Sequence, residues 1–256
     1  PNLGSGNHFA LLGNRFDGAG FHLTRAYVNR SVWMSNRYED AGFTAMAHVG
    51  RNAGSPPTQR NCIVDNVFTT ETIDVVAMGP ANSTFNEYAE NFLFEGNRFI
   101  SRSSGGACLK IRGSRVTIRN NVFDLAGRRA VQIEQWSGSP VPLPRDVVVE
   151  HNTMYRGAGS PLRTVHSSSG NATAVRFNLT FCAQGPTEAP SGNIAALQNL
   201  TGNPLFTNAN DGDFTLLPGS PAIDVAVTSR VRADYFRAQR PGAAAPDAGA
   251  FEVNEQ

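Results

Sequence analysis

The sequence has few charged residues, few cysteines and no long apolar run. Charged residues make up 17% of the 256 residues and balance to a net charge of +1, so electrostatics predict neither a nucleic acid nor an anionic membrane as partner. No run approaches the roughly 18 apolar residues that a membrane span needs. Cys62, Cys108 and Cys182 lie far apart without CxxC spacing, which argues against a disulfide framework or a zinc site. An alanine- and leucine-rich helical composition is also lacking, whereas 25 Gly and 15 Pro indicate many turns.

One short pattern recurs seven times along the chain. Each copy centres on an asparagine, with a large apolar residue three positions earlier and, in most copies, an aromatic residue two positions later. In "VTIRNNVFD" these places are taken by Ile118, Asn121 and Phe123. The central residues are Asn14, Asn36, Asn66, Asn97, Asn121, Asn152 and Asn178. A β-rich repeat of this period predicts a solenoid, in which each copy buries its apolar face by stacking on its neighbours.

The asparagine has a structural explanation in such a solenoid. Because a strand alternates its faces, the residues three and five positions before the asparagine point inward together. If the asparagine adopts a left-handed conformation, the chain turns sharply and the aromatic residue after it points inward again. Stacked at about 4.8 Å, successive asparagine amides would bond one another as an internal ladder. Leucine-rich and hexapeptide solenoids do not fit the observed period.

The repeat resembles the right-handed parallel β-helix proteins of the pectate-lyase-like superfamily over roughly residues 7–182. We therefore expect an all-β, right-handed parallel β-helix of about seven coils in residues 1–185, with residues 186–256 forming an irregular tail that packs on or caps it. The phrases "NPLFTNANDGDFTLLPGSPAID" and "DYFRAQRPGAAAPDAGAFE" resemble the tail of many secreted bacterial β-helix proteins. That resemblance implies a secreted or cell-surface bacterial protein.

Function in this superfamily generally lies on an outward groove along one parallel sheet. A second strand in each copy is expected in segments such as "CLKIRG" (108–113), "AVQIEQW" (130–136) and "LRTVHS" (162–167). Pairing the first two segments by their inward residues places Lys110 beside Gln132 and Arg112 beside Glu134. Further outward residues expected nearby are His22, His48, Arg163 and His166.

This polar stripe suits a polysaccharide lyase acting on a uronic-acid polymer. Removing the proton next to a uronate carboxylate requires a cation to neutralise the carboxylate and a base to take the proton. Lys110 or Arg112 could neutralise or, with a depressed pKa, act as base; His166 could be the base near neutral pH. Trp136 could stack on a sugar ring. The resemblance also implies that calcium held by Asp and Glu is frequent in such lyases, but no clear carboxylate cluster is found here.

Other interpretations stay open. A glycoside hydrolase on this fold would need two carboxylates, about 5–5.5 or 6.5–9.5 Å apart, and Asp74, Asp124 and Glu134 are the candidates. Arg112 and Glu134 could simply form a cross-strand ion pair. A non-catalytic carbohydrate-binding or surface protein would suit the fold equally well.

The outward face of the first copies is unusually apolar. Leu12, Met34 and Val64 occupy a position that holds Glu95 and Arg119 in later copies. Such a face indicates partial cover by the tail, by a missing N-terminal segment or by another copy in a homo-oligomer.

Overall fold

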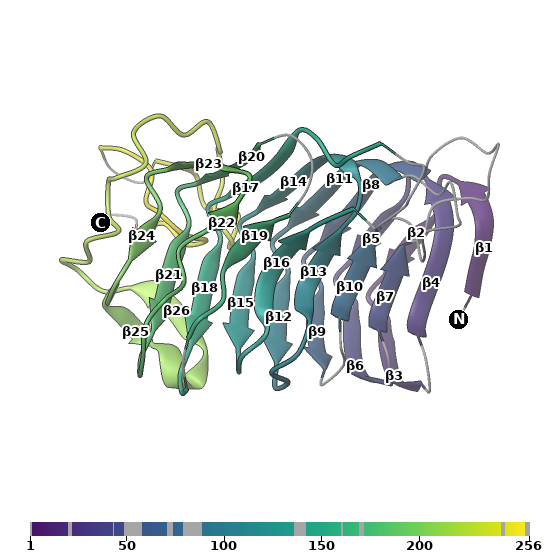
Figure 1. Cartoon of the computed structure of the whole chain (residues 1–256), viewed down its shortest axis with the longest axis horizontal. Coiled ribbons are helices and arrows are strands. Elements are labelled where there is room, and N and C mark those ends of the chain that lie inside the picture. The colour runs from purple at the N-terminus through teal and green to yellow at the C-terminus, as the bar shows by residue number, and fades with distance from the viewer. Residues whose placement is uncertain are drawn as a thin grey trace.

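The computed structural model describes residues 2–19, 22–42, 44–48, 58–70, 74–78, 89–135, 142–159, 161–168, 172–241 and 244–253. The chain winds as a right-handed parallel β-helix with three strands in each coil (Figure 1). In the described residues, each of the three parallel sheets, A to C, contains eight strands. The helical structure in the described residues is a short 3-10 turn, η1 (Ala209–Asp211), and no helix there is long and apolar enough to cross a membrane.

Successive strands enter the sheets in the order A, B, C. Sheet A consists of β1 (Asn2–Asn7), β4 (His22–Asn29), β7 (Thr44–His48), β10 (Asp74–Met78), β13 (Ala107–Ile111), β16 (Arg129–Ile133), β19 (Val165–Ser167) and β22 (Ser191–Gly192). Sheet B consists of β2 (Ala10–Leu12), β5 (Val32–Met34), β8 (Thr58–Val64), β11 (Ala89–Glu95), β14 (Ser114–Arg119), β17 (Val147–Glu150), β20 (Thr173–Arg176) and β23 (Ile194–Leu197). Sheet C consists of β3 (Arg15–Ala19), β6 (Arg37–Ala41), β9 (Val67–Thr70), β12 (Arg98–Ser101), β15 (Val122–Leu125), β18 (Thr153–Arg156), β21 (Leu179–Cys182) and β24 (Leu200–Thr201).

The asparagine ladder is present and continuous. Side-chain bonds of 2.9–3.2 Å join the seven predicted asparagines in order. The last of them, Asn178, donates from Nδ2 to Oδ1 of an eighth asparagine, Asn199, at 2.9 Å. The sequence pattern missed this eighth copy because Ala196 and Thr201 replace its large apolar and aromatic residues. The parallel sheets therefore continue to Thr201, past the expected boundary at residue 185.

The sharp turn into sheet C lies one residue earlier than expected. The left-handed residue is the one before each ladder asparagine, with φ between 47° and 67°, namely Gly13, Ser35, Asp65, Gly96, Asn120, His151, Phe177 and Gln198. The ladder asparagine itself follows the corner. Its amide points inward because the residue before it has already turned the chain from sheet B toward sheet C. In "VTIRNNVFD" the two asparagines thus have different roles: Asn120 turns the chain and Asn121 joins the ladder.

Aromatic rings stack along the interior as the repeat predicted. Phe16, Tyr38, Phe68, Phe99 and Phe123 form a column with ring centroids 4.7–5.0 Å apart and interplanar angles of 3° to 23°. Each stacked pair stabilises the core by about 0.5–1.5 kcal/mol beyond the area it buries. The apolar rows of sheets A and B fill the rest of this core.

The tail packs against the outer side of the later coils. Its hairpin, β25 (Phe206–Asn208) with β26 (Asp213–Leu216), and the segment to Val253 cover the outer face of sheet C, with Phe214 and Phe251 packed on Val122 and Tyr155. Gly249 lies so close to sheet C that an added Cβ would be 2.9 Å from atoms of Leu179 and Thr153.

A buried arginine fastens the tail. Arg240, fully buried, donates to the carbonyl oxygens of Asp247 and Gly249, to Glu252 and to Nδ1 of His151 in the β-helix. The residues of the "RP…D.GA.E" phrase thus attach the tail to the β-helix. The tail leaves the early coils of sheet B uncovered among the described residues: Leu12 and Met34 are 54% and 38% exposed.

Candidate functional site

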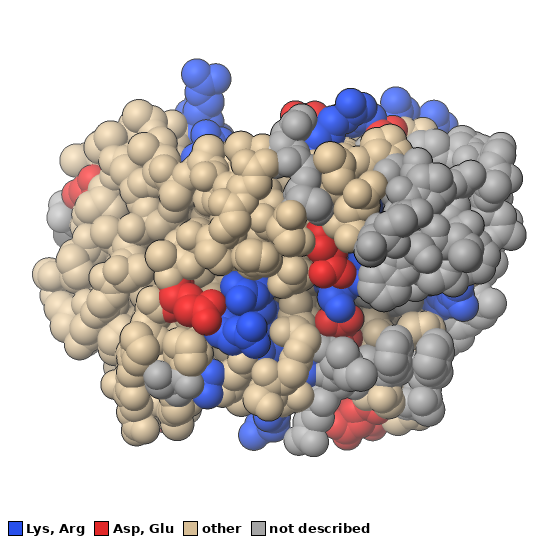
Figure 2. All heavy atoms as spheres, viewed as in Figure 1, with Lys and Arg blue, Asp and Glu red and all other residues tan. Residues whose placement is uncertain are grey.

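Sheet A brings the predicted stripe together. Lys110 pairs with Gln132, Gln132 pairs with His166, and His166 pairs with Ser191 on successive strands. Because parallel neighbours lie about 4.8 Å apart, these side chains form one row on the outer face. Figure 2 shows basic and acidic side chains gathered in the middle of the face seen in Figure 1, over the central strands of sheet A.

Lys110 is held by a carboxylate on the preceding coil. Its Nζ lies 2.7 Å from Oδ2 of Asp74, and Oδ1 of Asp74 accepts the backbone N–H of Ala107 at 3.2 Å. The two side chains are only 18% and 11% exposed, so water screens their attraction poorly. The pair fixes the position of Nζ on the outer face of sheet A, where it can contact an anionic ligand.

Arg112 and Glu134 form the expected cross-strand ion pair. Both Nε and Nη2 of Arg112 donate to Oε1 of Glu134, at 3.1 and 2.7 Å. The Arg112 side chain is 8% exposed, whereas that of Glu134 is 22% exposed. Arg112 therefore positions the Glu134 carboxylate at the surface and does not itself present a free cation.

Two further arginines meet at Glu188. Nη2 of Arg129 lies 3.3 Å from Oε2 of Glu188, and Nε of Arg163 lies 3.9 Å from Oε1. Burial, and then repulsion by Arg163, lower the pKa of Arg129 from its usual value. Nη1 of Arg129 is buried and has no hydrogen-bond partner among the described residues. An unsatisfied, buried guanidinium N–H is a site for an acceptor oxygen.

These groups surround one open hollow of about 240 Å³. Its lining consists of Gly106, Ala107, Lys110, Arg129, Gln132, Glu134 and Arg163. Three cations and one carboxylate thus face the same space, and the small residues at one side leave room for a ligand. The hollow can bind a carboxylate and hydroxyl groups beside it.

His166 borders this hollow without lining it. Its Nδ1 lies 2.9 Å from Oγ of Ser191, and register places it beside Gln132. No partner of Nε2 is present among the described residues. His166 is half-buried, and its contact with Ser191 fixes the orientation of the imidazole ring.

The remaining predicted residues are not gathered here. His22, half-buried, lies on β4 in the row of Thr44 and Asp74, and burial and then Arg25 lower its pKa. The backbone of His48 pairs with Met78, one position away from the Ala77–Lys110 row, and its side chain is outside the described residues. Trp136 also lies outside the described residues.

The paired-carboxylate hypothesis is wrong for one of its three candidates. Asp124 lies on β15 in sheet C, where burial is the main cause of its raised pKa, and not on the stripe of sheet A. Asp74 and Glu134 lie on that stripe, but each is paired with a cation.

The described residues do not fit a calcium site. They contain no group of three or more His, Cys, Asp or Glu side chains that could hold a metal ion. Around the hollow, the carboxylates of Asp74, Glu134 and Glu188 are all engaged by cations.

Arg129 and Glu188 escaped the sequence prediction for identifiable reasons. Arg129 is two positions before the inward Val131, so alternation predicts that it points into the core, and it is 9% exposed. Glu188 lies in the segment assigned to the tail, but its N–H bonds the carbonyl of Leu162 just before β19. The sequence feature that could have drawn attention to Arg129 is the pair Arg128–Arg129 at the start of a buried strand.

Comparisons with known proteins support the fold. No protein-family model matches the sequence, and no curated protein matches it. Among solved structures, pectate lyase Pel9A is similar over 99% of this chain and 68% of its own, with a TM-score of 0.65 and 14% sequence identity. At that identity the likeness shows a shared architecture: the chain is a parallel β-helix of the kind seen in a pectate lyase.

Proposed function

We propose that the chain binds an acidic polysaccharide across the outer face of sheet A and cleaves it by β-elimination. The observation that most strongly supports this proposal is the open hollow that Lys110, Arg129 and Arg163 line together. A uronic acid residue presents one carboxylate among hydroxyl groups, which complements three cations beside Gln132 and Glu134. The parallel β-helix fold shared with a pectate lyase supports this class of reaction.

The cations would bind and activate the substrate. Arg129 supplies a buried N–H without a partner, and Arg163 lies beside it on the same carboxylate. Neutralising the uronate carboxylate lowers the pKa of the adjacent C5–H bond, because negative charge developing there spreads into the carboxylate. Lys110, held in place by Asp74, adds a third cation.

His166 is assigned as the base. Its place beside Gln132 puts an imidazole next to the hollow, and its Nε2 has no partner among the described residues. Nε2 takes the C5 proton, the C4–O4 bond breaks, and the electron pair of the C–H bond forms a C4=C5 double bond. The departing O4 takes a proton from water. Polymers of this kind are extracellular, in keeping with the export implied by the tail.

The test is a lyase assay on uronic-acid polymers. Turnover should produce the ultraviolet absorbance of an unsaturated product, and His166→Gln and Lys110→Ala should each reduce kcat about 10²- to 10⁴-fold. A control is Arg145→Met, which removes an exposed arginine before β17 in sheet B and should leave the rate unchanged. Reducing sugar without absorbance would show hydrolysis instead, and binding without turnover would show a non-catalytic protein.

A further inference from the structure

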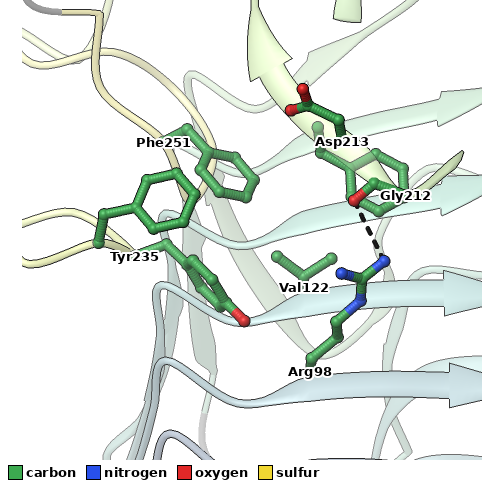
Figure 3. Close-up of a pocket in the computed structure, with 8 residues that line it drawn as sticks. Arg98, Val122, Gly212, Asp213, Tyr235 and Phe251 are labelled. Atoms are coloured by element: carbon green, nitrogen blue, oxygen red, sulfur yellow. Dashed lines mark hydrogen bonds between the residues drawn. The ribbon is translucent and has the colours of Figure 1, made fainter. Parts of the chain in front are cut away.

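A second hollow lies between sheet C and the tail, away from sheet A. Arg98 and Val122 line it from the β-helix, and Asp213, Tyr235, Phe236 and Phe251 line it from the tail (Figure 3). Its volume is about 80 Å³. Figure 3 shows Tyr235 and Arg98 extending from opposite sides toward Val122, so one wall is formed by aromatic rings and the other by Arg98 beside the Phe214 ring.

The aromatic wall is a cluster of three rings. The centroids of Tyr235, Phe236 and Phe251 are 5.2–5.4 Å apart in each pair. Phe251 is buried, but Phe236 is 64% exposed. A phenylalanine supported by two rings and open to water offers a rigid apolar platform for a flat ligand.

The Arg98 wall carries an unused donor. Nη2 of Arg98 donates to the carbonyl oxygen of Gly212 at 3.1 Å, and the guanidinium lies 5.8 Å from the centre of the Phe214 ring. Nε of Arg98 is buried and has no hydrogen-bond partner among the described residues. Gly212 permits this close approach, because a Cβ there would lie 2.0 Å from Nη2. A buried N–H without an acceptor is costly, which favours a ligand oxygen at this place.

We propose that this hollow is a second ligand site that binds a neutral sugar residue. Asp213 and Arg98 border the same apolar surface: Oδ1 of the exposed Asp213 carboxylate accepts from the N–H and hydroxyl of Thr215, which leaves Oδ2 as an acceptor, and Arg98 supplies a donor. A hydroxylated ring can use the acceptor, the donor and the apolar surface together. Its hydroxyl groups donate and accept hydrogen bonds, and its C–H face packs on Phe236. Opposite charges on the walls disfavour a purely cationic or purely anionic ligand. A hollow of about 80 Å³ holds a hydroxymethyl group, while the ring lies on the platform.

The inference rests on the proposed function only in taking a polysaccharide as its ligand. The two hollows share no lining residue and belong to different sheets. The site on sheet C would therefore anchor a polymer without taking part in cleavage.

The experiment is an NMR titration of aromatic ring resonances with methyl galactopyranoside in the full chain. Saturable shifts of Tyr235, Phe236 and Phe251 are expected, with at least tenfold weaker binding in Phe236→Ala and retained binding in Phe236→Trp. Because Phe236 is largely exposed, its replacement should leave the fold intact. Lys110→Ala should bind the sugar as the unmodified chain does.

Three results would overturn the inference. They are the absence of saturable shifts, shifts of equal size in Phe236→Ala, and tighter binding of tetramethylammonium or acetate than of the sugar at the same ionic strength. Failure of the lyase assay with sugar binding intact would remove the proposed function and leave this site. Lyase activity without these shifts would do the reverse.

Discussion

Lys110 Nζ and Asp74 Oδ2 lie 2.7 Å apart on adjacent strands of sheet A, and this pair decides which role the lysine can take. The ion pair holds Nζ of Lys110 at the edge of the hollow, where it can contact a substrate carboxylate. Asp74→Asn would remove the partner while keeping its shape.

We predict that Asp74→Asn lowers kcat far less than Lys110→Ala, because the substrate carboxylate still meets an ammonium group. A steady-state comparison of the two variants measures this. If Lys110 were the base, Asp74→Asn would instead change the rate as strongly as Lys110→Ala does. That outcome would contradict the assignment of His166.

Arg129→Met should weaken substrate binding more than it slows the chemical step. The change removes Nη1, a buried donor without a hydrogen-bond partner among the described residues. The ion pair between Glu188 and Arg163 stays in place. A charge-assisted hydrogen bond is worth about 1.5–3 kcal/mol, so KM should rise roughly 10- to 150-fold. Calorimetric binding of an oligouronate to an inactive His166→Gln background gives an independent measure. An unchanged affinity would place the carboxylate elsewhere.

Removing one rung from the middle of the ladder should destabilise the chain more than removing the last rung. Asn121 donates to Phe94, Arg119 and Asn152 and accepts from Asn97, and all of these bonds except the partly buried one to Arg119 lie in the buried interior. Asn121→Ala leaves several of these groups unsatisfied, at a cost of about 3 kcal/mol or more. Asn199→Ala, at the half-buried end, should cost about 1 kcal/mol. Urea unfolding midpoints give the comparison, and equal losses would argue against the ladder as a continuous stabilising unit.

Acidification should destabilise the junction between tail and β-helix through His151. Burial, and then the Arg240 guanidinium, lower the pKa of His151 to about 3. Unfolded His151, with an ordinary pKa near 6.5, takes up a proton first, so its contribution to stability is present above pH about 6.5 and declines as the pH falls toward 3. Between pH 7 and 5 the loss from this residue is about 2 kcal/mol.

His151→Asn is the matched variant for this prediction. Asparagine tolerates the left-handed conformation at this position, where φ is 51°, and does not titrate. The variant should therefore lose about 2 kcal/mol less than the unmodified chain over the same pH interval, measured by urea unfolding at both pH values. Parallel losses in the two proteins would show that His151 is not the titrating group.

The sequence alone predicted the repeating part of this protein. Residues such as Asn121 and Phe123 recur in step because each coil must present the same inward surface to its neighbours, and that requirement is written into local spacing. The pairing of Lys110 with Gln132 and of Arg112 with Glu134 followed from the same inward phase, since parallel strands align their buried residues. The turn was misplaced by one residue, because Asn120 and Asn121 are both able to adopt left-handed backbone and the pattern does not distinguish them.

Only the tertiary structure decided how the candidate site is composed. Asp74, Arg129 and Glu188 come from separate coils, and Glu188 returns from beyond the segment that the repeat covers. Arg129 occupies an inward-facing position of its strand and still borders a surface hollow, because Ala107 at the start of the neighbouring strand β13, and Gly106 just before it, leave space beside it. Spacing along a strand determines which face of the sheet a residue takes. The shape and charge of a site depend instead on the side chains that neighbouring coils bring together and on the places where a small residue leaves space.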